Sequence, residues 1–230
     1  MKTCFITLLI AALVTPVYSQ DLRFDVHGAY SRSIRLDKVR SATLVGHILP
    51  NFPSDWIAAY ELVEISSVRA GKTVSATGAN AILSSEQQNV LKSAVVGADI
   101  AISIKYKREN AVTGVMETNT MRYQLTVVPD IEAEYRGGYQ RLQRYLDEYA
   151  IGKITVANLK ELQTVSAIFT VDEEGGITEA RIKKTSGDNR TDSVLLDAIR
   201  NMPPWKPAEL SGGLRVKQNF VFTVAGGDDC

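Results

Sequence analysis

The chain has 230 residues, of which 45% are hydrophobic and 23% are charged. These proportions are typical of a folded globular protein, and the length fits one large domain or two small ones. Lys plus Arg and Asp plus Glu number 26 each, so no overall charge draws the chain to nucleic acid or to an anionic membrane. Nucleic-acid binding is therefore not expected.

Residues 1–19 have the layout of a secretory signal peptide. A short positive start precedes an apolar run over residues 5–14, Pro16 breaks that run, and small residues stand at the −3 and −1 positions before Gln20. The apolar run is roughly half of the ~20 residues needed to span a bilayer. An uncleaved membrane anchor is the alternative. We expect cleavage, export to the periplasm and no integral membrane segment in the mature chain.

The part that follows, residues 20–130, is predicted to be a β-rich, sandwich-like domain. Residues 42–49 alternate loosely between apolar and polar. Residues 99–106 alternate strictly, and residues 120–128 do so again. Because turn residues stand at 110–114, these last two segments predict an antiparallel hairpin within the domain.

Residues 131–230 predict a compact α+β domain with an antiparallel three-stranded sheet and two helices. The pattern reads helix, hairpin, helix and closing strand. The expected elements are a helix over 139–149, strands over 165–171 and 177–184 around an acidic glycine turn, a short helix ending near 200, and a strand over 214–224.

A tryptophan stands among prolines between the second helix and the last strand. Pro203, Pro204 and Pro207 stiffen this connector, since each proline fixes its own φ and restricts the residue before it. Either Trp205 packs on the sheet and fastens the connector, or the connector presents Trp205 and Lys206 to a partner. Packing is favoured, because a large aromatic side chain on a rigid connector fills a core efficiently.

Residues with catalytic or metal-binding chemistry are not grouped in the sequence. His27 and His47 are the only imidazoles, and neither stands at ligand spacing from a cysteine or a carboxylate pair. After cleavage Cys230 would be the only cysteine, which excludes a disulfide within the mature chain. We therefore expect no enzyme activity, no metal and no cofactor.

Two stretches carry a family resemblance: VSAIFTVDEEGGITEARIKKTSG and SVLLDAIRNMPPWKPAELSGGLRVKQNFVFTV. With the Glu-Tyr-x-Gly-Gly segment at 134–138, they make residues 131–224 similar to the C-terminal domain of TonB-type energy transducers, in the form common in Bacteroidetes. The most specific part is the Met-Pro-x-Trp-Lys-Pro run between a helix and a closing strand. Residues 94–128 are faintly similar to β-domains of the periplasmic shaft protein of the gliding and type 9 secretion machinery.

The TonB resemblance implies a periplasmic domain that binds the plug side of outer-membrane transporters. Such domains pair a short peptide with an exposed strand edge, so that main-chain hydrogen bonds supply binding. Here the implied edge strand is residues 215–224. Its residues Arg215, Lys217 and Asn219 are expected to face solvent or a partner. The candidate partner-binding residues are Trp205, Lys206, Arg215, Lys217, Asn219 and Val221.

The chain departs from a complete transducer, because a cleavable signal and a folded β-domain replace the inner-membrane helix and the Pro-rich span. We therefore expect a TonB-like adaptor without its own membrane anchor, which binds an outer-membrane transporter or an envelope complex. The alternative is a structural scaffold component that forms a homodimer or larger oligomer through the same edge strand.

Overall fold

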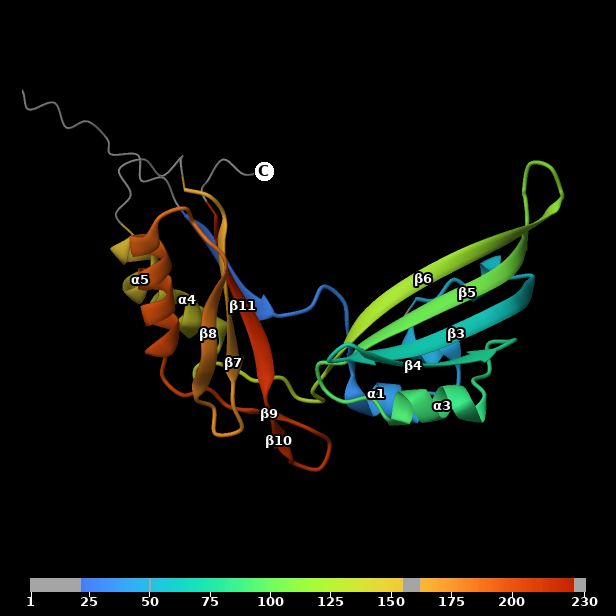
Figure 1. Cartoon of the computed structure of the whole chain (residues 1–230), viewed down its shortest axis with the longest axis horizontal. Coiled ribbons are helices and arrows are strands. Elements are labelled where there is room, and N and C mark those ends of the chain that lie inside the picture. Colours follow the sequence, from blue (N-terminus) through green and yellow to red (C-terminus); the bar gives the residue numbers. More distant parts are fainter. Residues whose placement is uncertain (1–21, 50, 155–161, 226–230) are drawn as a thin grey trace, which may run out of the picture.

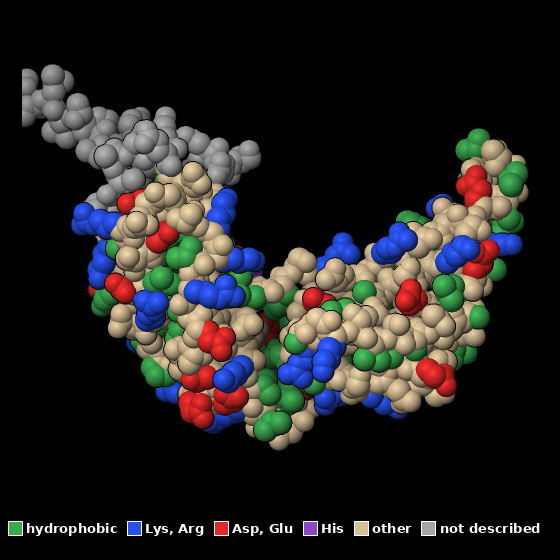
Figure 2. Space-filling model, viewed as in Figure 1, with side chains coloured by type: hydrophobic (Ala, Val, Ile, Leu, Met, Phe, Trp, Pro, Cys, Tyr) green, Lys and Arg blue, Asp and Glu red, His purple; other side chains and the backbone are tan. Residues whose placement is uncertain are grey.

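Two units, each a sheet with helices on one face, make up the computed structural model of the chain, which describes residues 22–49, 51–154 and 162–225 (Figure 1). The predicted α+β class is confirmed. The units meet at a narrow junction, and Figure 2 shows an open hollow between them on the face in view.

The first unit contains a five-stranded sheet in the order β2-β6-β5-β3-β4. Neighbouring strands are antiparallel, except that β2 runs parallel to β6. The predicted hairpin is confirmed as β5 and β6, in which Ile102 lies opposite Tyr123. The strands are β2 (Ser33–Arg35), β3 (Ala59–Arg69), β4 (Lys72–Gly78), β5 (Asp99–Glu109) and β6 (Met116–Val128).

Helices, not a second sheet, cover this first sheet, which corrects the sandwich-like interpretation (Figure 1). The apolar residues of 42–49 fall at helical spacing, so that Val45, Ile48 and Leu49 are buried together and the segment forms a short helix. The helical elements are α1 (Leu36–Ser41), α2 (Val45–Ile48), α3 (Ser85–Lys92) and a 3-10 turn, η1 (Ser54–Trp56).

The second unit has a four-stranded antiparallel sheet in the order β1-β11-β7-β8, with α4 and α5 on one face (Figure 1). A two-stranded ladder of β9 and β10 lies beside it. The elements are β1 (Arg23–Gly28), α4 (Tyr139–Tyr149), η2 (Ile151–Lys153), β7 (Val165–Val171), β8 (Ile177–Lys184), α5 (Asn189–Arg200), β9 (Ala208–Glu209), β10 (Arg215–Val216) and β11 (Gln218–Ala225).

Strand β1 departs from the predicted domain division. It belongs by sequence to residues 20–130, yet it pairs with β11, from Arg23 opposite Ala225 to Gly28 opposite Phe220. The sheet thus has four strands where three were expected. Phe24 and Val26 alternate along β1 and pack against the core of the second unit, which gives the short strand a buried side.

Asp130 joins the two units at their junction. Its Oδ1 accepts a hydrogen bond from the Asp37 backbone N–H at 2.8 Å, and its Oδ2 accepts from the backbone N–H and hydroxyl of Ser211 at 2.6 and 2.8 Å. Burial raises the pKa of Asp130, but the hydrogen bonds from Ser211 and Asp37 outweigh it and hold the pKa below its usual value. The ionised carboxylate therefore stabilises the junction.

Replacing Asp130 with Asn is expected to lower the free energy of unfolding by about 1 kcal/mol at pH 7, because an amide accepts fewer of these hydrogen bonds and the site is partly solvated. Since the folded pKa is lowered, the stabilisation is present above the ordinary pKa and lost as the pH falls through the folded value. Urea unfolding at pH 7 and pH 2.5 measures this. The difference from the parent should shrink at pH 2.5, and Asp197→Asn, on the exposed side of α5, should change neither value.

Candidate strand-pairing site around strand β11

Trp205 lies in the core of the second unit and is only 2% exposed. Its ring contacts the rings of Tyr135, Phe169 and Phe220, with centroids 5.6, 5.9 and 5.0 Å away. Its backbone N–H donates to the carbonyl of Gly175, in the turn between β7 and β8, at 2.8 Å. The packing interpretation is confirmed, and Trp205 is wrong as a partner-binding residue because no partner can reach it.

Lys206, the next residue, is exposed but already paired. Its Nζ lies 2.8 Å from Glu134 Oε2, and the backbones of the two residues exchange hydrogen bonds of 2.8 and 3.0 Å. These contacts fasten the proline connector to the segment before α4. The charge of Lys206 is therefore engaged within the chain.

Arg215 and Lys217 do not lie on one continuous strand with Asn219. The expected strand is broken, since Arg215 belongs to β10 and Lys217 separates β10 from β11. Arg215 pairs with Glu209 across the short ladder, with Nε 4.0 Å from Oε1. Lys217 is exposed and forms no ion pair with any other described residue.

Asn219 and Val221 differ in exposure, although both were expected on the partner-binding face. Asn219 is exposed, and its Oδ1 accepts a hydrogen bond from the Thr170 hydroxyl at 2.8 Å. Val221 is 7% exposed and lies between Ile168 of β7 and His27 of β1. Val221 is therefore a core residue, which corrects its assignment as a partner-binding residue.

Strand β11 is central in its sheet, so the predicted free edge is occupied. It pairs with β7 on one side and with β1 on the other. The sequence contained one signal of this arrangement, the alternation of apolar and polar residues in Arg-Phe-Asp-Val-His-Gly. That signal predicts a strand but does not identify the strand with which it pairs.

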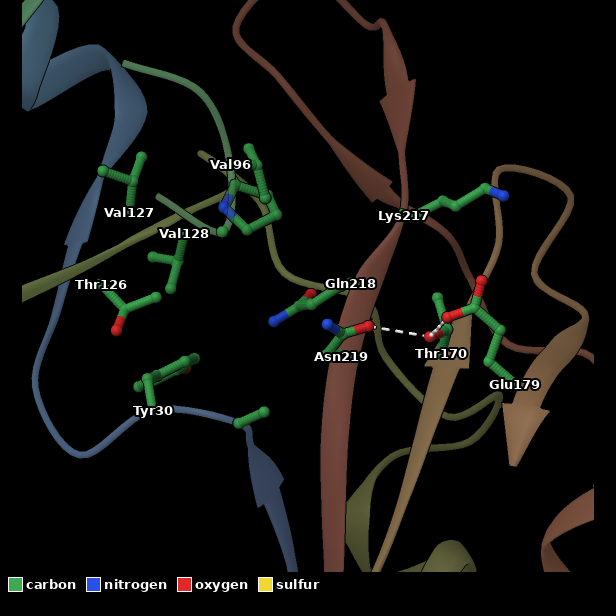
Figure 3. Close-up of a pocket in the computed structure, with 13 residues that line it drawn as sticks. Tyr30, Val96, Thr126, Val127, Val128, Thr170, Glu179, Lys217, Gln218 and Asn219 are labelled. Carbon is green, nitrogen blue, oxygen red and sulfur yellow. Dashed lines mark hydrogen bonds between the residues drawn. The ribbon is translucent and has the colours of Figure 1, made fainter. Parts of the chain in front are cut away.

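A cavity of about 320 Å³ lies where the start of β11 meets the first unit (Figure 3). It brings together Lys217 and Asn219, two of the candidate residues, with Tyr30, Thr170 and Glu179. In Figure 3 the Asn219 oxygen points to Thr170, and the amide nitrogen points toward the cavity. The cavity thus brings a lysine that forms no ion pair with a described residue, an amide donor and the carboxylate of Glu179 beside the end of β1.

Tyr30 closes the same junction from the segment after β1. Its hydroxyl donates to Glu132 Oε2 at 2.6 Å, and the side-chain amide of Gln218 donates to the same oxygen at 2.6 Å. Burial, followed by this hydrogen bond, raises the pKa of Tyr30. Tyr30 and Gln218 therefore hold the end of β1 against the start of β11.

Comparisons with protein-family models, with curated proteins and with solved structures found no match to this chain. Among the described residues, no helix combines the length and apolar character that a membrane span requires.

Proposed function

We propose that this chain is an exported, TonB-like binding protein without enzyme activity. It acts as an adaptor that engages an outer-membrane transporter or another envelope complex, and it takes an extended segment of that partner into its second sheet. The observation that carries this proposal is that β11 has already accepted a strand, β1, from a segment far away in the sequence. Main-chain hydrogen bonds along such an edge supply affinity for an extended segment.

The position of Trp205 supports the TonB resemblance. A helix, a proline connector and a closing strand surround one tryptophan, which contacts Phe169 of β7 and Phe220 of β11. The connector is therefore a structural element of the sheet that receives the partner. The partner segment pairs with β11 in the position that β1 occupies, next to the residues at the start of β11.

Lys217 is the candidate side chain best placed to contact a partner. It is exposed at the start of β11 and lines the junction cavity beside Asn219. Arg215 and Lys206 are instead paired with acidic residues of the same chain. We expect an acidic group of the partner near Lys217.

Self-assembly through the opposite edge of this sheet is less favourable. That edge is β8, whose exposed side chains include Arg181, Lys183 and Lys184. Pairing of two copies of β8 would bring these like charges together, which is a common protection of sheet edges against aggregation. The scaffold alternative is therefore secondary to the adaptor.

A photo-crosslinking amino acid at position 217 tests the proposal in cells that express the protein. We expect an outer-membrane transporter or an envelope component to be crosslinked at 217 and not at 184, an exposed lysine position on β8. In a second experiment the crosslinking amino acid stands at a position next to 217, and Lys217→Glu reverses the charge. The yield of the crosslinked product should then fall about five-fold, as expected for the loss of one ion pair. Equal products at 217 and 184, or only products with a second copy, contradict the adaptor function.

A further inference from the structure

We propose that β1 is an exchangeable strand, which a partner segment with the same apolar spacing displaces from β11. This inference rests on the proposed function, because it assigns the site where the partner segment binds. It also identifies the chemistry of that segment.

Strand β1 is held by its ladder with β11 and by the side-chain contacts of one face. Arg23, Asp25 and His27 are exposed, while Phe24 and Val26 are half-buried. The side-chain contacts include an edge-to-face pair of Phe24 with Phe222, with centroids 6.1 Å apart, and a hydrogen bond of 2.9 Å from the Tyr139 hydroxyl to Asp25. In Figure 1 β1 lies at the outer side of the sheet, so it is exposed to replacement.

Strand β11, which pairs with β1, is not suited to lose its neighbour on that side. Phe220, Phe222 and Val224 of β11 belong to the buried core, and loss of β1 would also leave a row of backbone N–H and C=O groups unpaired. Uncovered edges of this kind bind other strands. The position next to β11 is thus occupied by β1 or by a replacement for it.

The replacement must reproduce the buried side of β1. Phe24 and Val26 pack against the core of the second unit, and Gly28 is buried against the ring of Tyr30. The spacing is an aromatic residue, a β-branched residue two positions later and a small residue two positions after that. We therefore assign the partner segment as an extended, antiparallel stretch of another protein with the pattern aromatic-x-aliphatic-x-Gly.

Contacts just after Gly28 also hold β1, in addition to its ladder with β11. The Gly28 end of the strand is fastened, because the Ala29 N–H donates to the Asn219 carbonyl at 3.0 Å and the Tyr30 hydroxyl donates to Glu132 at 2.6 Å.

A fluorescent peptide with the sequence of residues 22–29, LRFDVHGA, tests the exchange by anisotropy on the chain from Gln20 to Cys230. The internal strand competes at an effective concentration on the order of mM, so weak binding is expected for the parent. Phe24→Ser with Val26→Ser weakens the internal strand, and the peptide should bind this variant about ten-fold more tightly. His27→Ser, on the exposed side of β1, should bind like the parent. A peptide with serine at both apolar positions should not bind.

A disulfide between β1 and β11 gives a second measurement, which does not depend on the folding of the serine variant. Asp25 lies opposite Thr223, and opposite residues of an antiparallel pair are within disulfide distance. Asp25→Cys with Thr223→Cys, in a chain with Cys230→Ser, should bind the peptide when reduced and not when oxidised.

For the cysteine variant, equal peptide binding by its oxidised and reduced forms overturns the exchange, and so does no binding to its reduced form at mM peptide. For the serine variant, Phe24→Ser with Val26→Ser, a folded protein that binds the peptide like the parent overturns it as well. If the serine variant forms a concentration-dependent dimer in light scattering, the strand is exchanged with a second copy of the chain, which also overturns exchange with another protein. The outcome is separable from that of the proposed function. A crosslinked envelope partner without peptide exchange rejects the exchange alone, and peptide exchange without an envelope partner rejects the adaptor alone.

Discussion

Replacing Trp205 with alanine is expected to lower the free energy of unfolding by about 3–5 kcal/mol, the range for truncation of a large buried aromatic residue. The indole fills the space between Tyr135, Phe169 and Phe220, and its removal leaves a cavity that the proline-stiffened connector cannot close by moving inward. Urea unfolding followed by circular dichroism measures the loss, which should fall on the transition of the second unit.

The second tryptophan provides the matched control. Trp56 is 53% exposed and lies under the guanidinium of Arg108, 5.1 Å from its ring centroid. An exposed contact of this type contributes about 0.5–1 kcal/mol, so Trp56→Ala should cost much less than Trp205→Ala. Equal losses from the two substitutions would contradict a core built around Trp205.

Gly175→Ala is expected to cost about 2–5 kcal/mol. Gly175 has a φ of +87°, and a Cβ there would overlap the backbone carbonyl of Trp205. The left-handed conformation alone costs an alanine roughly 1–2 kcal/mol, and displacing a packed backbone adds a cost on the order of 1–3 kcal/mol. Thermal unfolding should show a lower transition temperature for the second unit.

A glycine with similar strain but open surroundings separates these two costs. Gly71 has a φ of +76°, and a Cβ there would meet no atom within 4 Å. Gly71→Ala should therefore show the conformational cost alone, roughly 1–2 kcal/mol. If the two alanine variants lose the same stability, the contact between the β7–β8 turn and the connector has no energetic role.

Much of the local structure could be predicted from periodicity. The alternation in β5 and β6 predicted their hairpin, and the helical spacing in residues 139–149 predicted α4. The short apolar run over 42–49 was ambiguous, because strand and helix patterns differ little over so few residues. The burial of Trp205 was predictable from the prolines on either side of it.

The candidate site was predictable only in part, since it depends on pairing between distant segments. The pattern of β11 and the alternation in β1 each indicate a strand, but neither pattern identifies the two strands as neighbours. Likewise, Lys217 and Asn219 meet Tyr30 only because the two units are joined at Asp130 and Glu132. Single-sequence patterns describe local periodicity and do not specify such long-range contacts.

The insertion of β1 beside β11 has a consequence for the order in which the protein assembles. The first unit is continuous over residues 33–128, whereas the second sheet needs residues 23–28 and 218–225 at the same time. During synthesis, the first of these segments emerges long before the other. The first unit can fold as its residues emerge, as domains generally do. The second sheet can form completely only after Ala225 has emerged, and until then β1 has no β11 with which to pair.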